Sequence, residues 1–168
     1  MRMTGNIQIT LPTDLEIAMT REFNAPRKLV YEALVTPSLL TRWLLGPPGW
    51  IMTKCLLDPR VGGKYRYEWK NEGDGSTMGM GGTFTEVVAG ERLVATELFD
   101  EAWYPGEGHV AQTLREQAGK TTLHILLRYE SKDARDGVLK IPMDQGMEAS
   151  YVRLDAMLAE MQTQGGKR

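Results

Sequence analysis

Hydrophobic and polar residues alternate over several segments of the chain, and this alternation predicts β-strands. Residues 15–23 place Leu15, Ile17 and Met19 on one face and mostly polar residues on the other, as in a half-buried strand. Between residue 50 and about residue 129, short alternating segments are separated by turns that contain glycine. About six further strands are predicted in this region, including segments at 64–69, 77–88, 92–99, about 109–116 and 121–129.

Apolar residues spaced three and four positions apart predict helices elsewhere in the chain. Two short helices follow the first strand, one with its apolar face at residues 29–34 and one that begins at Thr36-Pro37. Proline is well tolerated in the first turn of a helix, where its missing N–H has no intrahelical partner. The segment GPPGW at 46–50 ends the second helix, because two prolines cannot continue it.

The longest helical pattern lies near the C-terminal end and predicts one helix of about twenty residues over 143–161. Its apolar positions are Met143, Met147, Tyr151, Leu154, Leu158 and Met161. The charged segment 131–142 is predicted to be a loop. Residues 1–14 are predicted to form a flexible leader, in which a short edge strand is an open alternative, 15–162 a single domain and 163–168 a disordered tail.

These elements predict an α+β fold with a curved antiparallel sheet, two short helices and one long C-terminal helix packed on the concave face of the sheet. A chain of 168 residues suits one domain with a substantial core. Its 42% hydrophobic and 25% charged residues are ordinary for a globular protein.

Charge and composition exclude several classes of function. A net charge of −2 argues against nucleic acid as a partner, and no apolar run approaches the ~20 residues that a membrane span requires. Cys55 is the only cysteine, so no intrachain disulfide can form and a cytoplasmic location is expected. One cysteine and two distant histidines do not make a zinc site, so we expect no metal, and no cofactor-binding motif is present.

The order of several sequence blocks resembles a known family. The blocks are FNAPRKLVYEALVTPSLLTRW, GPPGW, DPRVGGKYRY, GGTFTEVVAGERLV and QGMEASYVRLDAML. Over residues 15–162 they resemble the START-like (SRPBCC, Bet v 1-like) superfamily and, within it, homologues of the heat-shock-protein-90 ATPase activator. The resemblance implies the helix-grip fold. Leu44 and Met147 stand at two positions where many relatives carry tryptophan.

A long helix over a bent sheet leaves an elongated cavity, and such a cavity is usually apolar with a few polar groups. The residues expected to line it are Trp43, Trp50, Tyr65, Tyr67, Trp69, Met80, Phe84, Trp103, Met143, Met147 and Tyr151. His109 follows the loop that contains Trp103 and would face the mouth of the cavity. The alternative interpretation is that these side chains simply form the core. No catalytic residue is assigned, because a general base needs a positioned partner and a bound substrate.

Three functions remain open at this point. The first is a binder of a small hydrophobic molecule, and the second is a protein-interaction module of the chaperone-activator kind with a chaperone as its partner. The third is an enzyme related to cyclases or hydratases, which rests on analogy of fold alone. Sheet edges that need covering would favour a homodimer.

Overall fold

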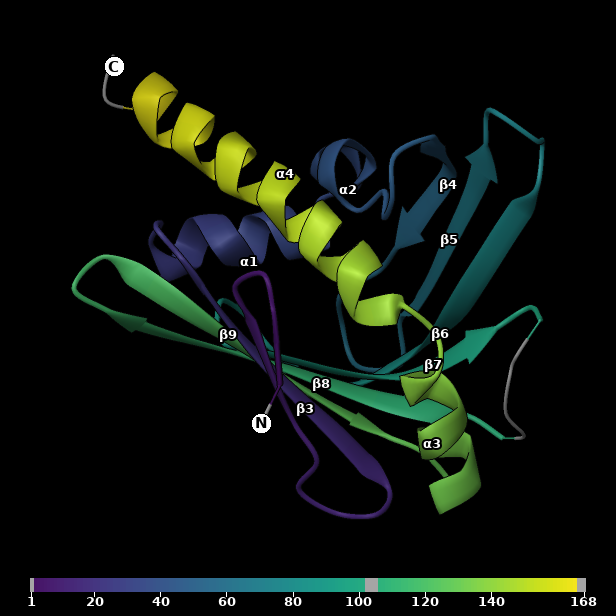
Figure 1. Cartoon of the computed structure of the whole chain (residues 1–168). Coiled ribbons are helices and arrows are strands. Elements are labelled where there is room, and N and C mark those ends of the chain that lie inside the picture. Colours follow the sequence, from purple (N-terminus) through teal and green to yellow (C-terminus); the bar gives the residue numbers. More distant parts are fainter. Residues whose placement is uncertain (1, 102–105, 166–168) are drawn as a thin grey trace.

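The computed structural model describes residues 2–101 and 106–165, and over these residues the chain forms one curved antiparallel sheet and four helices (Figure 1). The strands are β1 (Arg2–Thr4), β2 (Ile7–Thr10), β3 (Glu16–Phe23), β4 (Trp50–Leu57), β5 (Lys64–Asn71), β6 (Thr77–Val88), β7 (Arg92–Phe99), β8 (Gly108–Gln117) and β9 (Lys120–Arg128). The helices are α1 (Arg27–Val35), α2 (Pro37–Trp43), α3 (Lys132–Leu139) and α4 (Met143–Gly165). The predicted α+β helix-grip architecture is therefore confirmed.

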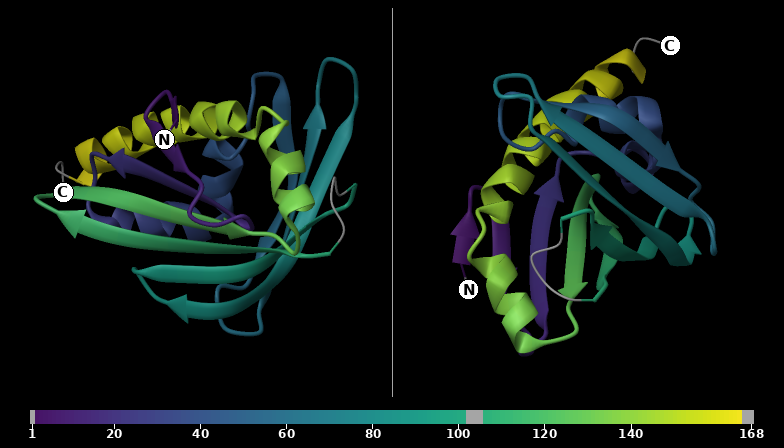
Figure 2. Two further views of the ribbon diagram at one scale, coloured as in Figure 1. Left: turned by 60° about the horizontal axis from the view of Figure 1, so that its bottom comes forward. Right: turned by 90° about the vertical axis from the view of Figure 1, so that its right-hand side faces the viewer.

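The sheet runs in the order β1-β2-β3-β9-β8-β7-β6-β5-β4, with every neighbouring pair antiparallel. Register shifts interrupt the β4–β5 ladder between Met52 and Lys54 and the β6–β7 ladder between Phe84 and Glu86. Such irregularities bend a strand and increase its local twist. The sheet curves, and α4 crosses one side of it with α1 and α2 on that same side (Figures 1 and 2).

The N-terminal segment is more ordered than the sequence analysis predicted. Instead of a flexible leader over 1–14, residues 2–10 form the β1–β2 hairpin, which extends the sheet beyond β3. Ile7 and Ile9 are 1% and 5% exposed. Their period-2 spacing in NIQIT is a weak signal because the strand is only four residues long.

The prediction of a loop over 131–142 was wrong, because α3 occupies Lys132–Leu139. Ser131 caps this helix by accepting a hydrogen bond from the Ala134 N–H. Ala134 and Val138 are buried one turn apart, while the remaining positions are mostly charged. Arg135 is also buried and donates to the Thr13 carbonyl at 2.6 Å. One of the charged residues that suggested a loop therefore anchors the helix to the rest of the chain.

The long C-terminal helix is confirmed and runs slightly further than expected. It is continuous from Met143 to Gly165, so residues 163–165 of the predicted disordered tail are helical. Tyr151, Leu154 and Leu158 are at most 5% exposed, while Met147 is only partly buried. No helix in the described part of the chain is long and apolar enough to cross a membrane.

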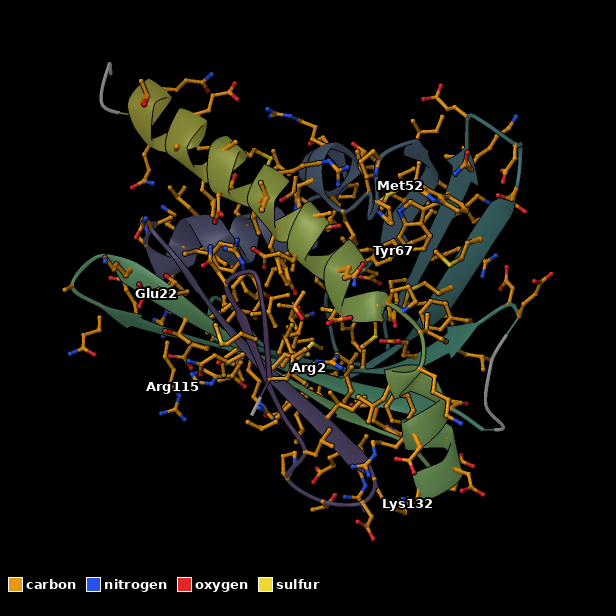
Figure 3. The ribbon with its side chains drawn as sticks, viewed as in Figure 1. Arg2, Glu22, Met52, Tyr67, Arg115 and Lys132 are labelled. Atoms are coloured by element: carbon orange, nitrogen blue, oxygen red, sulfur yellow. The ribbon has the colours of Figure 1, made fainter. Side chains whose placement is uncertain are left out.

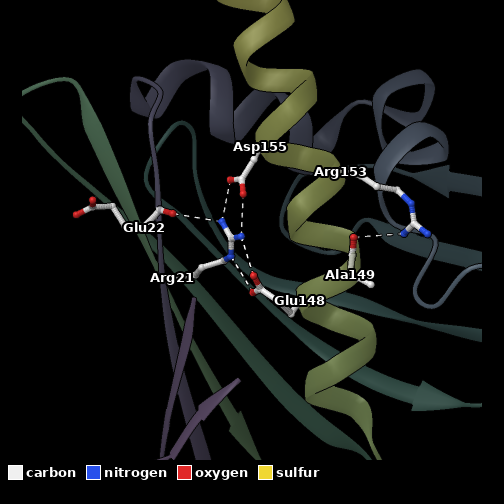
Figure 4. Close-up of polar contacts among 6 residues, drawn as sticks. All are labelled: Arg21, Glu22, Glu148, Ala149, Arg153 and Asp155. Carbon is white, nitrogen blue, oxygen red and sulfur yellow. Dashed lines mark hydrogen bonds and ion pairs between the residues drawn. The ribbon is translucent and has the colours of Figure 1, made fainter. Parts of the chain in front are cut away.

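A buried arginine joins this helix to the sheet. Arg21 lies on the inward face of β3, is 3% exposed, and forms two hydrogen bonds to each of Glu148 and Asp155 at 2.8–3.0 Å (Figure 4). Its guanidinium also lies over the rings of Phe23 and Tyr151, 4.8 and 5.7 Å from their centroids. Burial works to lower the pKa of Arg21, but the hydrogen bonds to the two carboxylates outweigh it and raise that pKa, so the side chain stays charged.

Leu154 provides a direct test of how α4 packs. Leu154→Ala should lower the free energy of unfolding by about 2–5 kcal/mol, because a fully buried side chain leaves a void. Val152→Ala, on the exposed side of the same helix, should change it by less than about 0.5 kcal/mol. Urea denaturation of both variants measures the two values, and equal losses would mean that this face of α4 is not packed on the sheet.

The ion-pair network predicts that removing one charged partner lowers the free energy of unfolding more than removing two partners together. Arg21→Met should cost about 3–5 kcal/mol, since it leaves the largely buried Glu148 carboxylate without its partner. Combining Arg21→Met with Glu148→Leu should restore part of that loss, because the uncompensated buried charge is removed. Arg42→Met, which breaks the exposed pair with Glu160, serves as the control and should cost at most about 1 kcal/mol. If Arg21→Met matched this control in denaturation experiments, the network would not hold the helix.

Candidate ligand-binding cavity

A cavity of about 230 Å³ lies between the inward face of the sheet and the N-terminal half of α4, with α1 and α2 along one side. Each strand from β4 to β9 contributes to its wall, as do Met143, Met147 and Tyr151 of α4. The wall is predominantly apolar. Figure 3 shows Tyr67 projecting from β5 on the side of α4.

Most of the residues predicted to line a cavity do line this one. Alternate positions of β5 and β6 face inward, as the period-2 pattern requires, and the helical residues come from α2 and α4. The predicted residues found in the wall are Trp43, Tyr65, Tyr67, Trp69, Met80, Phe84, Met143, Met147 and Tyr151.

Three predicted residues are not part of this wall. Trp50 lies beside Arg66 and Glu68 in a separate surface hollow. His109 is exposed, because it alternates along β8 with Val110 and therefore points away from the cavity. A strand position cannot be assigned to a face until its register is known, and the sequence pattern around residue 109 is too weak to define that register. Trp103 lies outside the described residues.

Aromatic side chains in the wall contact one another, and three of them donate hydrogen bonds to backbone carbonyls. Tyr65 packs against Tyr67 and Phe84 with ring centroids 5.2 and 5.5 Å apart. The indole N–H of Trp43 donates to the Ala33 carbonyl, and that of Trp69 donates to the Leu44 carbonyl. The Tyr65 hydroxyl donates to the Thr96 carbonyl at 2.7 Å. These hydrogen bonds fix the rings and leave their apolar surfaces toward the interior.

Glu97 is the polar residue that the sequence analysis missed. It lies on β7 in the inward-facing series Leu93, Ala95, Glu97 and Phe99, so a carboxyl stands on an otherwise apolar face. Among the described residues, none forms a hydrogen bond or ion pair with it. Burial among apolar groups raises the pKa of the Glu97 carboxyl to about 7. The signal in the sequence was the same alternation that predicted the strand, which places position 97 inside.

Gln112 is the second polar residue of the wall, and it lies far from Glu97. On β8, Gln112 pairs with Leu93, whereas Glu97 pairs with Gly108. Four residues of strand separate Leu93 from Glu97, so the two polar side chains start about 13 Å apart. They do not converge on one point. In the described part of the chain, no three His, Cys, Asp or Glu side chains are grouped so that they could hold a metal ion.

The sequence of the chain matches a known family. The profile of the family described as Activator of Hsp90 ATPase homolog 1-like protein matches residues 24–159. The chain belongs to this family, and the resemblance drawn from the sequence blocks is confirmed. No curated protein matches the chain.

Solved structures agree with this assignment. A protein from Rhodobacter sphaeroides is 34% identical, with a TM-score of 0.85 over 92% of this chain and 99% of that chain. A protein from Chromobacterium violaceum is 29% identical, with a TM-score of 0.73 over 87% and 98%. An Hsp90 activator from Plasmodium falciparum is 21% identical, with a TM-score of 0.52 over 68% and 72%, and therefore shares the fold alone.

The position of Glu97 predicts a pH dependence of stability. Its pKa rises from an ordinary 4.5 to about 7 on folding, so between these values the folded state keeps a proton that the unfolded chain has lost. The free energy of unfolding should therefore fall as the pH rises from 4.5 to 7 and then level off. Glu97→Gln should be more stable than the parent at pH 8, by on the order of 2–3 kcal/mol, with little difference near pH 4.5.

The control for this prediction is Glu72→Gln, which removes the same charge from an exposed hairpin. Its stability should follow the parent profile at every pH. Denaturation curves at pH 4.5, 6 and 8 give the comparison. Parallel profiles for Glu97→Gln and the parent would show that the carboxyl is solvated.

Proposed function

We propose that this protein binds one small hydrophobic molecule in the cavity under α4. The observation that carries the proposal is a space of about 230 Å³ between α4 and the sheet whose wall is aromatic and aliphatic apart from Glu97 and Gln112. An apolar cavity of about 150 Å³ already holds benzene. The space therefore suits a ligand somewhat larger than one ring, at the small end of ligand sites.

The arrangement of polar groups favours binding over catalysis. An enzyme site brings an acid or base and a charge-stabilising group to one reacting atom. Here Glu97 and Gln112 start about 13 Å apart along β7 and β8. They suit two ends of a bound molecule better than a single reaction centre.

An interaction with a chaperone is the second candidate, and it draws support from the family description. Exposed apolar side chains outside the cavity would serve such a role, and Ile51 and Leu56 on the edge strand β4 are 40% and 60% exposed. They pair with Lys70 and Arg66 of β5, so charged residues interrupt the apolar surface. The continuous apolar wall of the cavity favours a bound ligand over this interrupted surface as the main function.

Met147 allows the cavity to be filled from the helix side. Met147→Trp should weaken naphthalene binding by about tenfold or more and benzene binding less, since overfilling a packed site costs about 1–3 kcal/mol. Titration calorimetry, together with the ligand-induced rise in melting temperature, provides the measurement. Val152→Trp adds the same side chain to the exposed side of α4 and should leave both affinities unchanged.

Tyr67→Ala tests the opposite wall, because it removes a ring that faces the cavity from β5. It should change the affinity for naphthalene, while Met78→Ala, at an exposed position of β6, should not. If naphthalene bound equally well to Met147→Trp, Tyr67→Ala and the parent, the ligand would lie outside the cavity. The interaction-surface function would then be preferred.

A further inference from the structure

The wall of the cavity contains the carboxyl of Glu97, which has no hydrogen-bond or ion-pair partner among the described residues. Hydrogen bonds around Glu97 are already formed by other groups: the Thr96 carbonyl accepts from the Tyr65 hydroxyl, and the Thr96 hydroxyl accepts from the Thr83 N–H. No described residue contributes a hydrogen bond or a positive charge to Glu97. A partly buried carboxyl in apolar surroundings without a described partner lowers stability, so its presence in the fold calls for an explanation.

The surroundings of Glu97 leave room for a ligand group. Its partner across the β7–β8 ladder is Gly108, which has no side chain to cover the carboxyl. On the other side, the pairs of the β6–β7 ladder pass from Gly81–Leu98 to Phe84–Ala95, so Gly82 is the β6 residue nearest in register to Glu97. Glu97 itself lines the cavity, so its carboxyl adjoins space that a ligand group can occupy.

The aromatic wall determines which ligand group suits that space. Phe99 follows Glu97 at the next inward position of β7, and Tyr65 and Tyr67 extend the aromatic surface over β5. A carboxylate beside aromatic rings is the combination that stabilises a cationic nitrogen, by a charge-assisted hydrogen bond and by cation–π attraction. A ligand without a donor would leave the carboxyl unpaired and more deeply buried.

We propose that the ligand of this cavity is a small apolar amine, whose ammonium group pairs with the Glu97 carboxylate while its apolar body lies against the aromatic wall and Met147. The proposal rests on the proposed function and specifies the chemical class of the molecule bound. Gln112, at the far part of the wall, is available to a second polar group of a longer ligand.

A matched pair of ligands tests the proposal. 2-(Aminomethyl)naphthalene and 2-ethylnaphthalene have nearly the same shape, but only the first carries an ammonium group at pH 8. The parent protein should bind the amine about tenfold or more tightly than the hydrocarbon, as expected for a hydrogen bond between charged groups. Titration calorimetry at pH 8 measures both affinities.

Substitution at Glu97 distinguishes recognition of the amine from binding of any apolar ligand in the cavity. Glu97→Gln should abolish the preference for the amine while retaining the hydrocarbon, and Glu72→Gln should keep the preference, since it removes an exposed charge of the same sign. Equal binding of both ligands by the parent, or a preference that persists in Glu97→Gln, overturns the amine proposal alone. If neither ligand binds the parent, the proposed function fails with it.

Discussion

The position of α4 over the sheet depends on a charged side chain in a place where the strand pattern calls for an apolar one. Arg21 shares the inward face of β3 with Ile17, Met19 and Phe23, and its guanidinium is hydrogen-bonded to Glu148 and Asp155 of α4. A buried ion pair adds little net stability compared with an apolar contact, but it accepts only one arrangement of its partners. The network therefore fixes the register and rotation of the helix more than it strengthens the fold.

A second set of polar contacts lies on the other flank of α4. The Gly46 N–H donates to the Ser150 hydroxyl at 2.8 Å, and Arg153 donates to the Gly46 carbonyl at 2.7 Å. With Arg21 on one side and the turn at Gly46 on the other, the helix is held by directional contacts at its edges. Its central apolar face does not have to pack completely to keep it in place. This explains how a cavity persists under a helix in which Leu154, Met157 and Leu158, further along, are at most 4% exposed.

The sequence predicted the parts of the fold that depend on regular spacing. The alternation in β3 and β5–β9 and the 4-3-4 spacing in α4 indicate which residues must avoid water, and one face of each element is buried as expected. The β1–β2 hairpin and α3 were missed because they are short, and their burial depends on distant contacts. Glu148 lies 127 residues from Arg21, and no local pattern reveals that pairing.

Arg21 and Glu97 both place an ionisable side chain where the strand pattern predicts an apolar one, but among the described residues only Arg21 has partners of opposite charge. Both are ionisable residues at inward positions of strands that otherwise alternate correctly. Arg21 is paired with two carboxylates within the chain, so it is explained by folding. Glu97 has no such partner among the described residues, and its pKa is raised to about 7 by burial alone. Natural sequences depart from local consistency mainly where function requires it. A carboxyl without a described partner in an aromatic wall is therefore the feature on which the proposed amine ligand rests.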